Sequence, residues 1–381
     1  MKKWDSARTV ELIGAKATLS QPVQVARSRG YLWFPVLARL GGDELLAVAS
    51  THADAHVKED FSAAFRSGDG GLSWQNLAML GESGYSHLTL GDGRTLLLPY
   101  YLRPSGGDLA GPCMLFSPGG KCESRPGGVR VALARKDRSF SPELGLAGFV
   151  FDGQPIRSQD SRHLATIYGY FEDEHRYSSV LLESADGFDW RQRSVISGFD
   201  CPLQGDEGPC EPTLLRLADG TLMCVFRLAS FVPYGRVLSR DDGRTWSAPA
   251  VLNGAFSVEP SLATVAGGAV MLSGGRPGTF AWLNLAGDGR NWQPIDIIDH
   301  HNACVGPAER IRCDAPTAWA PAADLIRHGQ RGFTSSYTEL LALDDTHLLM
   351  IYDRLGLGWH AIPTDLDETN SLWVVRMTVE R

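Results

Sequence analysis

The chain has 381 residues, of which 43% are hydrophobic and 21% are charged, a composition typical of a folded globular protein rather than a disordered one. Its formal net charge is −8, and no lysine- or arginine-rich segment stands out, which disfavours nucleic acid or an anionic membrane as a partner. No apolar run reaches the roughly 18 residues that a membrane-spanning helix needs. The 42 glycines and 21 prolines instead indicate many turns between short strands.

Short apolar strands joined by tight turns recur along the chain, and no segment shows sustained helical periodicity. In chain order the strand–turn–strand units are 34–48, 87–98, 213–225, 261–272 and 339–350, with a degenerate sixth unit starting at His163. Dividing 381 residues by six units leaves about 63 residues for each. That length suits four-stranded units with insertions.

A second repeat lies between these units and reads Ser-x-Asp-x-Gly-x-Ser/Thr-Trp. It is centred on Asp69 and Asp241, and versions one residue shorter are centred on Asp186 and Asp288. The aspartate accepts hydrogen bonds from the turn backbone, the glycine allows a positive φ, and the tryptophan fills the joint between units. The two repeats predict an all-β, six-bladed β-propeller that forms one domain over residues 1–381, with an insertion at about 294–332.

These repeats resemble those of the sialidase (neuraminidase) superfamily, whose six-bladed propellers carry such Asp-box, or BNR, turns. The resemblance covers nearly the whole chain, and it is specific for the fold but not for the reaction. It implies three arginines that hold a substrate carboxylate, a tyrosine nucleophile assisted by a glutamate, and an aspartate acid/base. It implies no cofactor.

The resemblance places Glu211 and Arg227 at the two open ends of one hairpin, sixteen residues apart, both pointing into a central pocket. Arg276 ends the next hairpin, where the family has another arginine of its triad. Tyr337 opens the last unit at the position of the family's nucleophile. A phenol has a pKa near 10, so its reaction at neutral pH requires a carboxylate base, and Glu211 is the candidate.

Two segments depart from the family pattern. Trp33 stands where the first arginine of the triad is expected, and it can stack on a sugar but cannot clamp a carboxylate. The loop over residues 51–60, where the family has its acid/base, contains His52, Asp54 and His56. Asp54 is the predicted acid/base, and either histidine could replace it. A metal site on these alternating residues is disfavoured, because no third ligand of clear spacing follows.

Further residues are expected to line the substrate pocket because they open or close predicted hairpins. They are His87, Tyr100 and His163, together with Trp33, His52 and His56. No individual role can be assigned to His87, Tyr100 or His163.

Six of the seven cysteines form three local pairs, Cys113/Cys122, Cys201/Cys210 and Cys304/Cys313, each nine residues apart. The repeated spacing favours three disulfides and hence a periplasmic or extracellular protein, although no signal peptide is visible. Free thiols would instead indicate the cytoplasm. Cys224 lies in an apolar run and is expected to be a buried thiol.

The sequence therefore favours an exo-glycoside hydrolase that removes a terminal, acidic sugar from a glycan with retention of configuration. The missing arginine leaves open a different carbohydrate-active enzyme on the same scaffold, either a deoxy-sugar hydrolase such as a rhamnosidase or a polysaccharide lyase. A non-catalytic glycan-binding propeller is a third possibility. The oligomeric state is not predicted.

Overall fold

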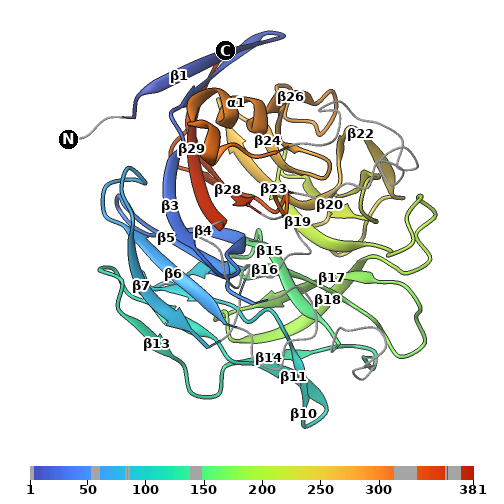
Figure 1. Ribbon diagram of the computed structural model, residues 1–381. Helices are drawn as coiled ribbons and strands as arrows, with labels where there is room; N and C mark the ends of the chain where they lie inside the picture. The colour runs from blue at the N-terminus through green and yellow to red at the C-terminus, as the bar shows by residue number, and fades with distance from the viewer. Residues whose placement is uncertain are drawn as a thin grey trace.

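The computed structural model describes residues 4–52, 61–81, 84, 86–137, 148–312, 333–356, 358 and 370–381. The predicted Asp54, His56 and Cys313 lie outside these residues. The described strands form six sheets around a common centre (Figure 1), which confirms the predicted β-propeller. We call the sheets blades 1–6, in the order of their innermost strands β4, β8, β15, β19, β23 and β27.

Blades 1, 4 and 5 are four-stranded antiparallel sheets whose strands follow the chain order. Blade 1 consists of β4 (Trp33–Gly41), β5 (Glu44–Ser50), β6 (Ser62–Ser67) and β7 (Gln75–Leu80). Blade 4 consists of β19 (Cys210–Arg216), β20 (Leu222–Arg227), β21 (Pro233–Ser239) and β22 (Ala250–Phe256). Blade 5 consists of β23 (Val258–Val265), β24 (Ala269–Gly275), β25 (Thr279–Asn284) and β26 (Gln293–Asp296).

Blades 2 and 3 are interleaved in sequence. Blade 2 consists of β8 (His87–Thr89), β9 (Thr95–Leu97), β12 (Met114–Phe116) and β13 (Cys122–Ser124). Blade 3 consists of β15 (Val150–Arg157), β16 (His163–Gly169), β17 (Ser178–Ser184) and β18 (Asp189–Ser197), and its outer edge is extended by β14 (Val129–Ala132), β11 (Asp108–Gly111) and β10 (Arg103–Ser105).

Blade 6 joins the two ends of the chain. It consists of β27 (Glu339–Ala342), β28 (His347–Leu355), β29 (Asn370–Glu380) and the N-terminal strands β3 (Val23–Ser28), β2 (Ala15–Ser20) and β1 (Ser6–Leu12). Both β2 and β3 pair with β29, so the first and last parts of the chain hold each other. The predicted insertion contains the helix α1 (Ile297–Cys304) and the single 3₁₀ turn η1 (Pro307–Glu309) before the described residues stop at 312. No helix in the described ranges is long and apolar enough to cross a membrane.

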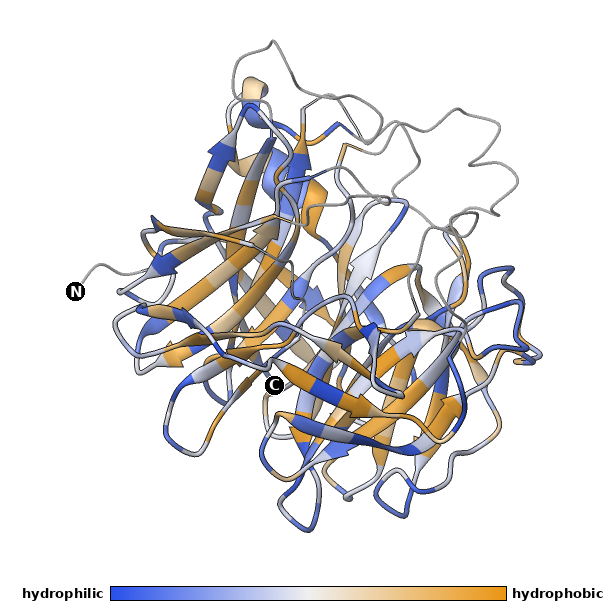
Figure 2. Ribbon diagram, turned by 90° about the horizontal axis from the view of Figure 1, so that it is seen from below, coloured by the Kyte–Doolittle hydropathy of each residue, from blue (hydrophilic) through white to orange (hydrophobic). Residues whose placement is uncertain are grey.

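The hydrophobic core lies between neighbouring blades rather than at the centre. For example, Leu45 and Ala47 of blade 1 pack against Leu349 and Ile351 of blade 6. Comparable clusters lie at the five other joints. Figure 2 shows apolar residues along the strands and hydrophilic residues at the turns. Because the blades bury both faces against each other, the polar groups at the starts of the innermost strands are left to form the centre.

The repeated aspartate turns adopt the expected geometry. In blade 1 the Asp69 carboxylate accepts hydrogen bonds from the Ser73 backbone N–H at 2.8 Å and the Ser73 hydroxyl at 2.7 Å. The Trp74 indole donates to the Gly71 carbonyl at 3.0 Å, and its ring packs into the joint between blades 6 and 1. The turns link the third strand of a blade to the fourth, away from the propeller's centre.

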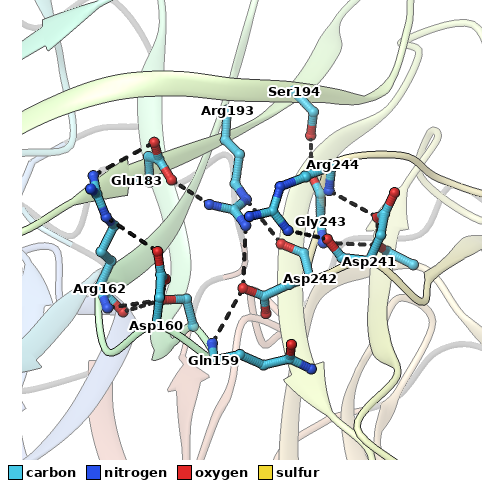
Figure 3. A network of polar contacts seen from close by, with 12 residues as sticks. Gln159, Asp160, Arg162, Glu183, Arg193, Ser194, Asp241, Asp242, Gly243 and Arg244 are labelled. Atoms are coloured by element: carbon cyan, nitrogen blue, oxygen red, sulfur yellow. Dashed lines mark hydrogen bonds and ion pairs between the residues drawn. The ribbon is translucent and has the colours of Figure 1, made fainter.

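A buried ion network joins the aspartate turn of blade 4 to blade 3 (Figure 3). Asp242 lies in that turn, and its carboxylate accepts from Arg216 at 2.6 Å, from Arg193 at 3.2 Å and from the Gln159 N–H at 3.2 Å. The other side of the Arg193 guanidinium contacts Glu183. The side chains of Arg193 and Asp242 are only 6% and 4% exposed, so their charges depend on each other.

The start of blade 3 differs from the prediction by one strand. The innermost strand is β15, whereas His163 opens β16, the second strand, opposite Arg157. The segment of β15 contains Gly153 and Pro155, which are both unfavourable inside a strand. Because of this composition, the segment of β15 does not show the apolar strand–turn–strand pattern of the other units.

The six described cysteines are free thiols, which corrects the predicted Cys113/Cys122 and Cys201/Cys210 disulfides. Cys122 pairs across β12 and β13 with Phe116, three residues beyond Cys113. That offset along a strand is about 10 Å, longer than a disulfide can span. Cys201 and Cys210 belong to different hydrophobic clusters. Cys304 is also free, and its predicted partner is not described. The expectation of export rested on these pairs.

We expect every one of these six thiols to be alkylated when the protein is unfolded in the absence of reductant. The physical reason is that all six described thiols are free, and that the strand register keeps the sulfur atoms of Cys113 and Cys122 apart. Peptide mass spectrometry after iodoacetamide treatment checks this result. A peptide linked through Cys113 and Cys122 would contradict the observed register.

Candidate active site

The centre of the propeller holds a direct contact between three of the predicted residues. The Tyr337 hydroxyl donates to Glu211 Oε1. Arg227 NH1 donates to the same oxygen at 2.6 Å and lies 3.1 Å from the Tyr337 hydroxyl. Blades 4 and 6 thus bring together residues that are far apart in the sequence.

Local backbone geometry aims Glu211 at this centre. It is the second residue of β19, has a φ of 45°, and lies at a bulge in the register between Cys210 and Thr213. Phe34 of blade 1 and Glu259 of blade 5 occupy equivalent bulges with φ values of 51° and 39°. Each of the three residues precedes a proline, which cannot donate to the sheet. The bulges turn these side chains out of the blade and toward the centre.

Glu211 is held by donors on both carboxylate oxygens. The Glu259 backbone N–H donates to Glu211 Oε2 at 2.8 Å, opposite the oxygen that accepts from Tyr337 and Arg227. A carboxylate is an acceptor only, so this set of donors suits its ionised form. Arg227 NH2 also contacts Glu207 at 2.7 Å, so its guanidinium already bridges two carboxylates.

Arg276 approaches Tyr337 from blade 5. It follows Gly275, the last residue of β24, and so lies one position beyond the place that Arg227 has at the end of β20. Its guanidinium donates to Ser230 Oγ at 3.1 Å and to the Ser335 carbonyl at 2.8 Å. The guanidinium carbon lies 5.7 Å from the centre of the Tyr337 ring. Two cations therefore flank the tyrosine.

Tyr337 is held in its neutral form in the free protein. Burial raises the pKa of Tyr337 well above its usual value near 10, and the negative charge of Glu211 raises it further. The guanidinium groups of Arg227 and Arg276 act in the opposite direction but are the smaller causes. The phenol can therefore act as a nucleophile only as its proton passes to Glu211.

Three further carboxyl groups, which the sequence analysis did not single out, interact with one another, and two of them, Asp152 and Glu259, also interact with Glu211. Asp152 of β15 and Glu259 of β23 share a side-chain hydrogen bond, and burial followed by the charge of Glu211 raises the pKa of Asp152 to about 8. Burial raises the pKa of Glu259 well above its usual value, with the charge of Asp152 as the next cause. Both carboxyl groups of the pair are therefore mainly protonated at neutral pH.

The third of these carboxyl groups, Glu339, belongs to blade 6. Its side chain is 6% exposed, and burial raises its pKa. One of its oxygens accepts from the Leu37 backbone N–H at 3.0 Å, and the other lies 3.6 Å from Nε2 of His87. His87, predicted to line the pocket, thus contacts this inner carboxyl.

Protonated Asp152 gives a pH dependence of stability with a definite sign. The folded protein retains this proton up to a pH near 8, whereas an unfolded aspartate releases it near its ordinary pKa of 3.8. The folded state binds more protons across that window, so its stability falls as the pH rises, by up to about 1.4 kcal/mol per pH unit.

We expect Asp152→Asn to make the free energy of unfolding less dependent on pH between 5 and 8, as measured by urea denaturation. The matched control is Asp219→Asn, an exposed residue whose pKa is lowered mainly by the Thr221 N–H, so its contribution falls below this window. Equal slopes in the wild type and Asp152→Asn would contradict a proton retained on Asp152.

Aromatic residues pack on the other side of Tyr337. Its ring centre lies 4.6 Å from that of Phe34, which stacks on Trp33 at 4.4 Å. Trp33 is 4% exposed and its indole donates to the His52 carbonyl at 2.8 Å. Trp33 therefore supports the aromatic wall behind Tyr337 and holds the backbone at His52.

The remaining predicted residues fall in two places. The Tyr100 hydroxyl forms a hydrogen bond with the Tyr168 hydroxyl at 2.8 Å. Burial raises the pKa of Tyr168, and Tyr100, Asp152 and Glu211 raise it further. His163 opens β16 and lies opposite Arg157, at the end of β15 that is remote from Asp152. It lines a different cavity together with Asp186. The structure therefore does not bring His163 to the central cluster.

The described residues contain no group of three or more His, Cys, Asp or Glu side chains arranged to hold a metal ion. The central cluster instead combines an Arg-held carboxylate, a neutral phenol and protonated carboxyl groups. Such a combination can accept one proton and release another within a few side chains.

No family model and no curated protein matches the sequence, but solved structures share its fold. A protein of unknown function from Dyadobacter fermentans aligns with a TM-score of 0.67 and 16% identity over 96% of this chain and 99% of its own. An α-L-arabinanase from Penicillium chrysogenum, complexed with arabinobiose, aligns with a TM-score of 0.57 and 14% identity, covering 94% and 98% of the two chains. The NanB sialidase of Streptococcus pneumoniae aligns with a TM-score of 0.54 and 14% identity, covering 94% of this chain and 70% of its own.

These likenesses define the fold class. The chain is a β-propeller of the kind that sialidases and arabinanases use. At this level of identity the likeness shows the fold alone, and the chemistry depends on the central residues.

Proposed function

We propose that the protein is a retaining glycoside hydrolase that uses Tyr337 as its nucleophile and Glu211 as the base. The observation that carries the proposal is the hydrogen bond from the Tyr337 hydroxyl to Glu211, with Arg227 on the same carboxylate oxygen. The glycosidase neighbours add support at the level of the fold.

In the first step the Tyr337 oxygen attacks the anomeric carbon while its proton passes to Glu211. The bond to the leaving oxygen breaks, and that oxygen takes a proton from an acid, for which we propose Asp54 in the loop that follows His52. In the second step water attacks the same carbon and the bond to Tyr337 breaks. Asp54 takes the water proton, and Tyr337 recovers its own from Glu211.

A neutral nucleophile suits an anomeric carbon that carries a carboxylate, because a phenol avoids the repulsion an anionic nucleophile would meet. This argument and the two arginines beside Tyr337 favour an acidic terminal sugar. Arg227 already bridges Glu211 and Glu207, so Arg276 is the better candidate for the substrate carboxylate.

A neutral sugar is the second candidate, because Trp33 occupies the position where the sequence pattern called for a third arginine and is buried against Phe34. The likeness to an arabinanase is consistent with this alternative. The cluster would then bind hydroxyl groups through Arg227 and Arg276.

A screen of aryl glycosides separates these candidates. The panel contains sialic acid, other ulosonic acids, uronic acids, rhamnose and arabinofuranose. We expect release of the aryl group from an acidic glycoside, with retained configuration of the first product by NMR. Release from none of them would contradict a glycosidase, and unsaturated products absorbing near 235 nm from a polysaccharide would indicate a lyase instead.

We expect the 2,3-unsaturated analogue of sialic acid to inhibit the enzyme only weakly. The reason is that Trp33 cannot supply the bidentate contact that an arginine would give to the inhibitor carboxylate. An inhibition assay on the best glycoside of the screen measures this. Sub-micromolar inhibition would show that another cation has taken the role of the missing arginine.

A further inference from the structure

A cavity of about 340 Å³ lies at the joint between blades 4 and 5. Arg236 of β21 and Asn253 of β22 line it from blade 4. Arg290, Asn291 and Trp292 line it from the aspartate turn of blade 5. It is large enough for one sugar ring with a substituent.

This cavity is separate from the central cluster. Glu211 is at the start of the first strand of blade 4, and Arg227 is at the end of the second. Because antiparallel strands alternate in direction, the turn between the third and fourth strands of a blade lies at its opposite end. The wall formed by 289–292 belongs to such a turn in blade 5. A ligand here would not touch Tyr337.

The polar lining consists of donors that lack an anionic partner. Neither guanidinium has a carboxylate within ion-pair distance in the part of the chain that the structure describes, and no acidic residue lines the cavity. Arg236 NH1 donates to the Gly289 carbonyl at 2.6 Å, which fixes its place in the wall. The nearby Asp288 carboxylate accepts from the Arg290 N–H and from Asn284 within its own turn.

The two arginines also repel each other. Burial lowers the pKa of the Arg236 guanidinium, and the charge of Arg290 lowers it further, with Asp288 a smaller opposing cause. A bound anion would remove this repulsion. Two guanidinium groups carry a charge of about +2, which matches a sulfate or phosphate group better than a single carboxylate.

We propose that this cavity binds the sulfate or phosphate group of an anionic ligand. Arg236 and Arg290 provide the charge, and the amides of Asn253 and Asn291 provide further donors. The space beside them and the indole of Trp292 leave room for a ring attached to that group. An ester on a sugar and a free inorganic anion share this chemistry.

Isothermal titration with sodium sulfate, at an ionic strength held constant with sodium chloride, tests the proposal. We expect saturable binding by the wild type, at least tenfold weaker binding by Arg290→Gln, and none by the double variant Arg236→Gln/Arg290→Gln. The matched control is Arg240→Gln, which removes the same charge from an exposed position beside the cavity-lining strand β21. We expect it to bind sulfate as the wild type does.

Arg236 contacts a backbone carbonyl, so a second variant guards against misfolding. Asn253→Asp changes an exposed residue and places a carboxylate in the cavity. It should weaken sulfate binding at least tenfold with an unchanged melting temperature. Unaltered binding in Arg290→Gln or Asn253→Asp, or an equal loss in Arg240→Gln, would overturn the proposal. If a monosaccharide sulfate binds more tightly than sulfate, the ligand is a sugar ester. If the two bind equally, the ligand is the free ion. Either outcome supports the site.

Discussion

Replacing Tyr337 with phenylalanine is expected to lower kcat by roughly 10²-fold or more on the glycoside that the screen identifies. In the proposed mechanism the phenol supplies the attacking oxygen, and phenylalanine has none. Because the substrate would still contact Arg276 and the aromatic wall, KM should change much less. Steady-state kinetics of the purified variant, with its melting temperature recorded alongside, measures the effect.

Glu211→Gln should cause a loss of similar size, because the amide cannot take the tyrosine proton. The double variant should be little worse than either single variant, since the two groups act as one unit. Tyr31→Phe is the matched control, because Tyr31 packs in the same aromatic cluster and its hydroxyl forms no hydrogen bond with the residues that the structure describes. Near-wild-type turnover in Tyr337→Phe would end the assignment.

Asp242→Asn is expected to lower the free energy of unfolding by about 3 kcal/mol. The substitution preserves shape, and asparagine tolerates the φ of 61° at this position. It removes the charge that Arg193 and Arg216 share, and Arg193 is almost wholly buried. Urea denaturation followed by fluorescence gives the value.

Asp108→Asn provides the comparison, because it breaks the ion pair to Arg130, whose side chain is 65% exposed. An exposed pair of this kind contributes at most about 1 kcal/mol. If Asp242→Asn and Asp108→Asn lowered the free energy of unfolding equally, the buried network between blades 3 and 4 would contribute no more to stability than an exposed ion pair.

The open ends of hairpins meet at one rim of a propeller, so the sequence could predict that four residues converge there: Glu211, Arg227, Arg276 and Tyr337.

The pair of carboxyl groups, Asp152 and Glu259, was not predicted, although the sequence contains one indication of Glu259. Glu259-Pro260 repeats the Glu211-Pro212 pattern at the start of the next hairpin. Asp152 could not be found in the same way, because the bulge at Gly153 made its strand unrecognisable.

The cysteine prediction failed for a different reason. Equal spacing suggested a common covalent role, but a spacing along the chain does not determine which residues face each other across a hairpin. Cys122 lies opposite Phe116, and this register is determined by the packing of β12 and β13 rather than by the thiols. Three equal intervals therefore carried no information about pairing.

Trapping the covalent intermediate tests the central claim most directly. The protein is incubated with a fluorinated glycoside of the preferred sugar that carries a good leaving group, then quenched with acid and digested for mass spectrometry. We predict one glycosyl group on Tyr337, and none on the protein when Tyr337→Phe is used. A glycosyl group on Glu211, Glu259 or Asp152, or a product of inverted configuration, would contradict the account.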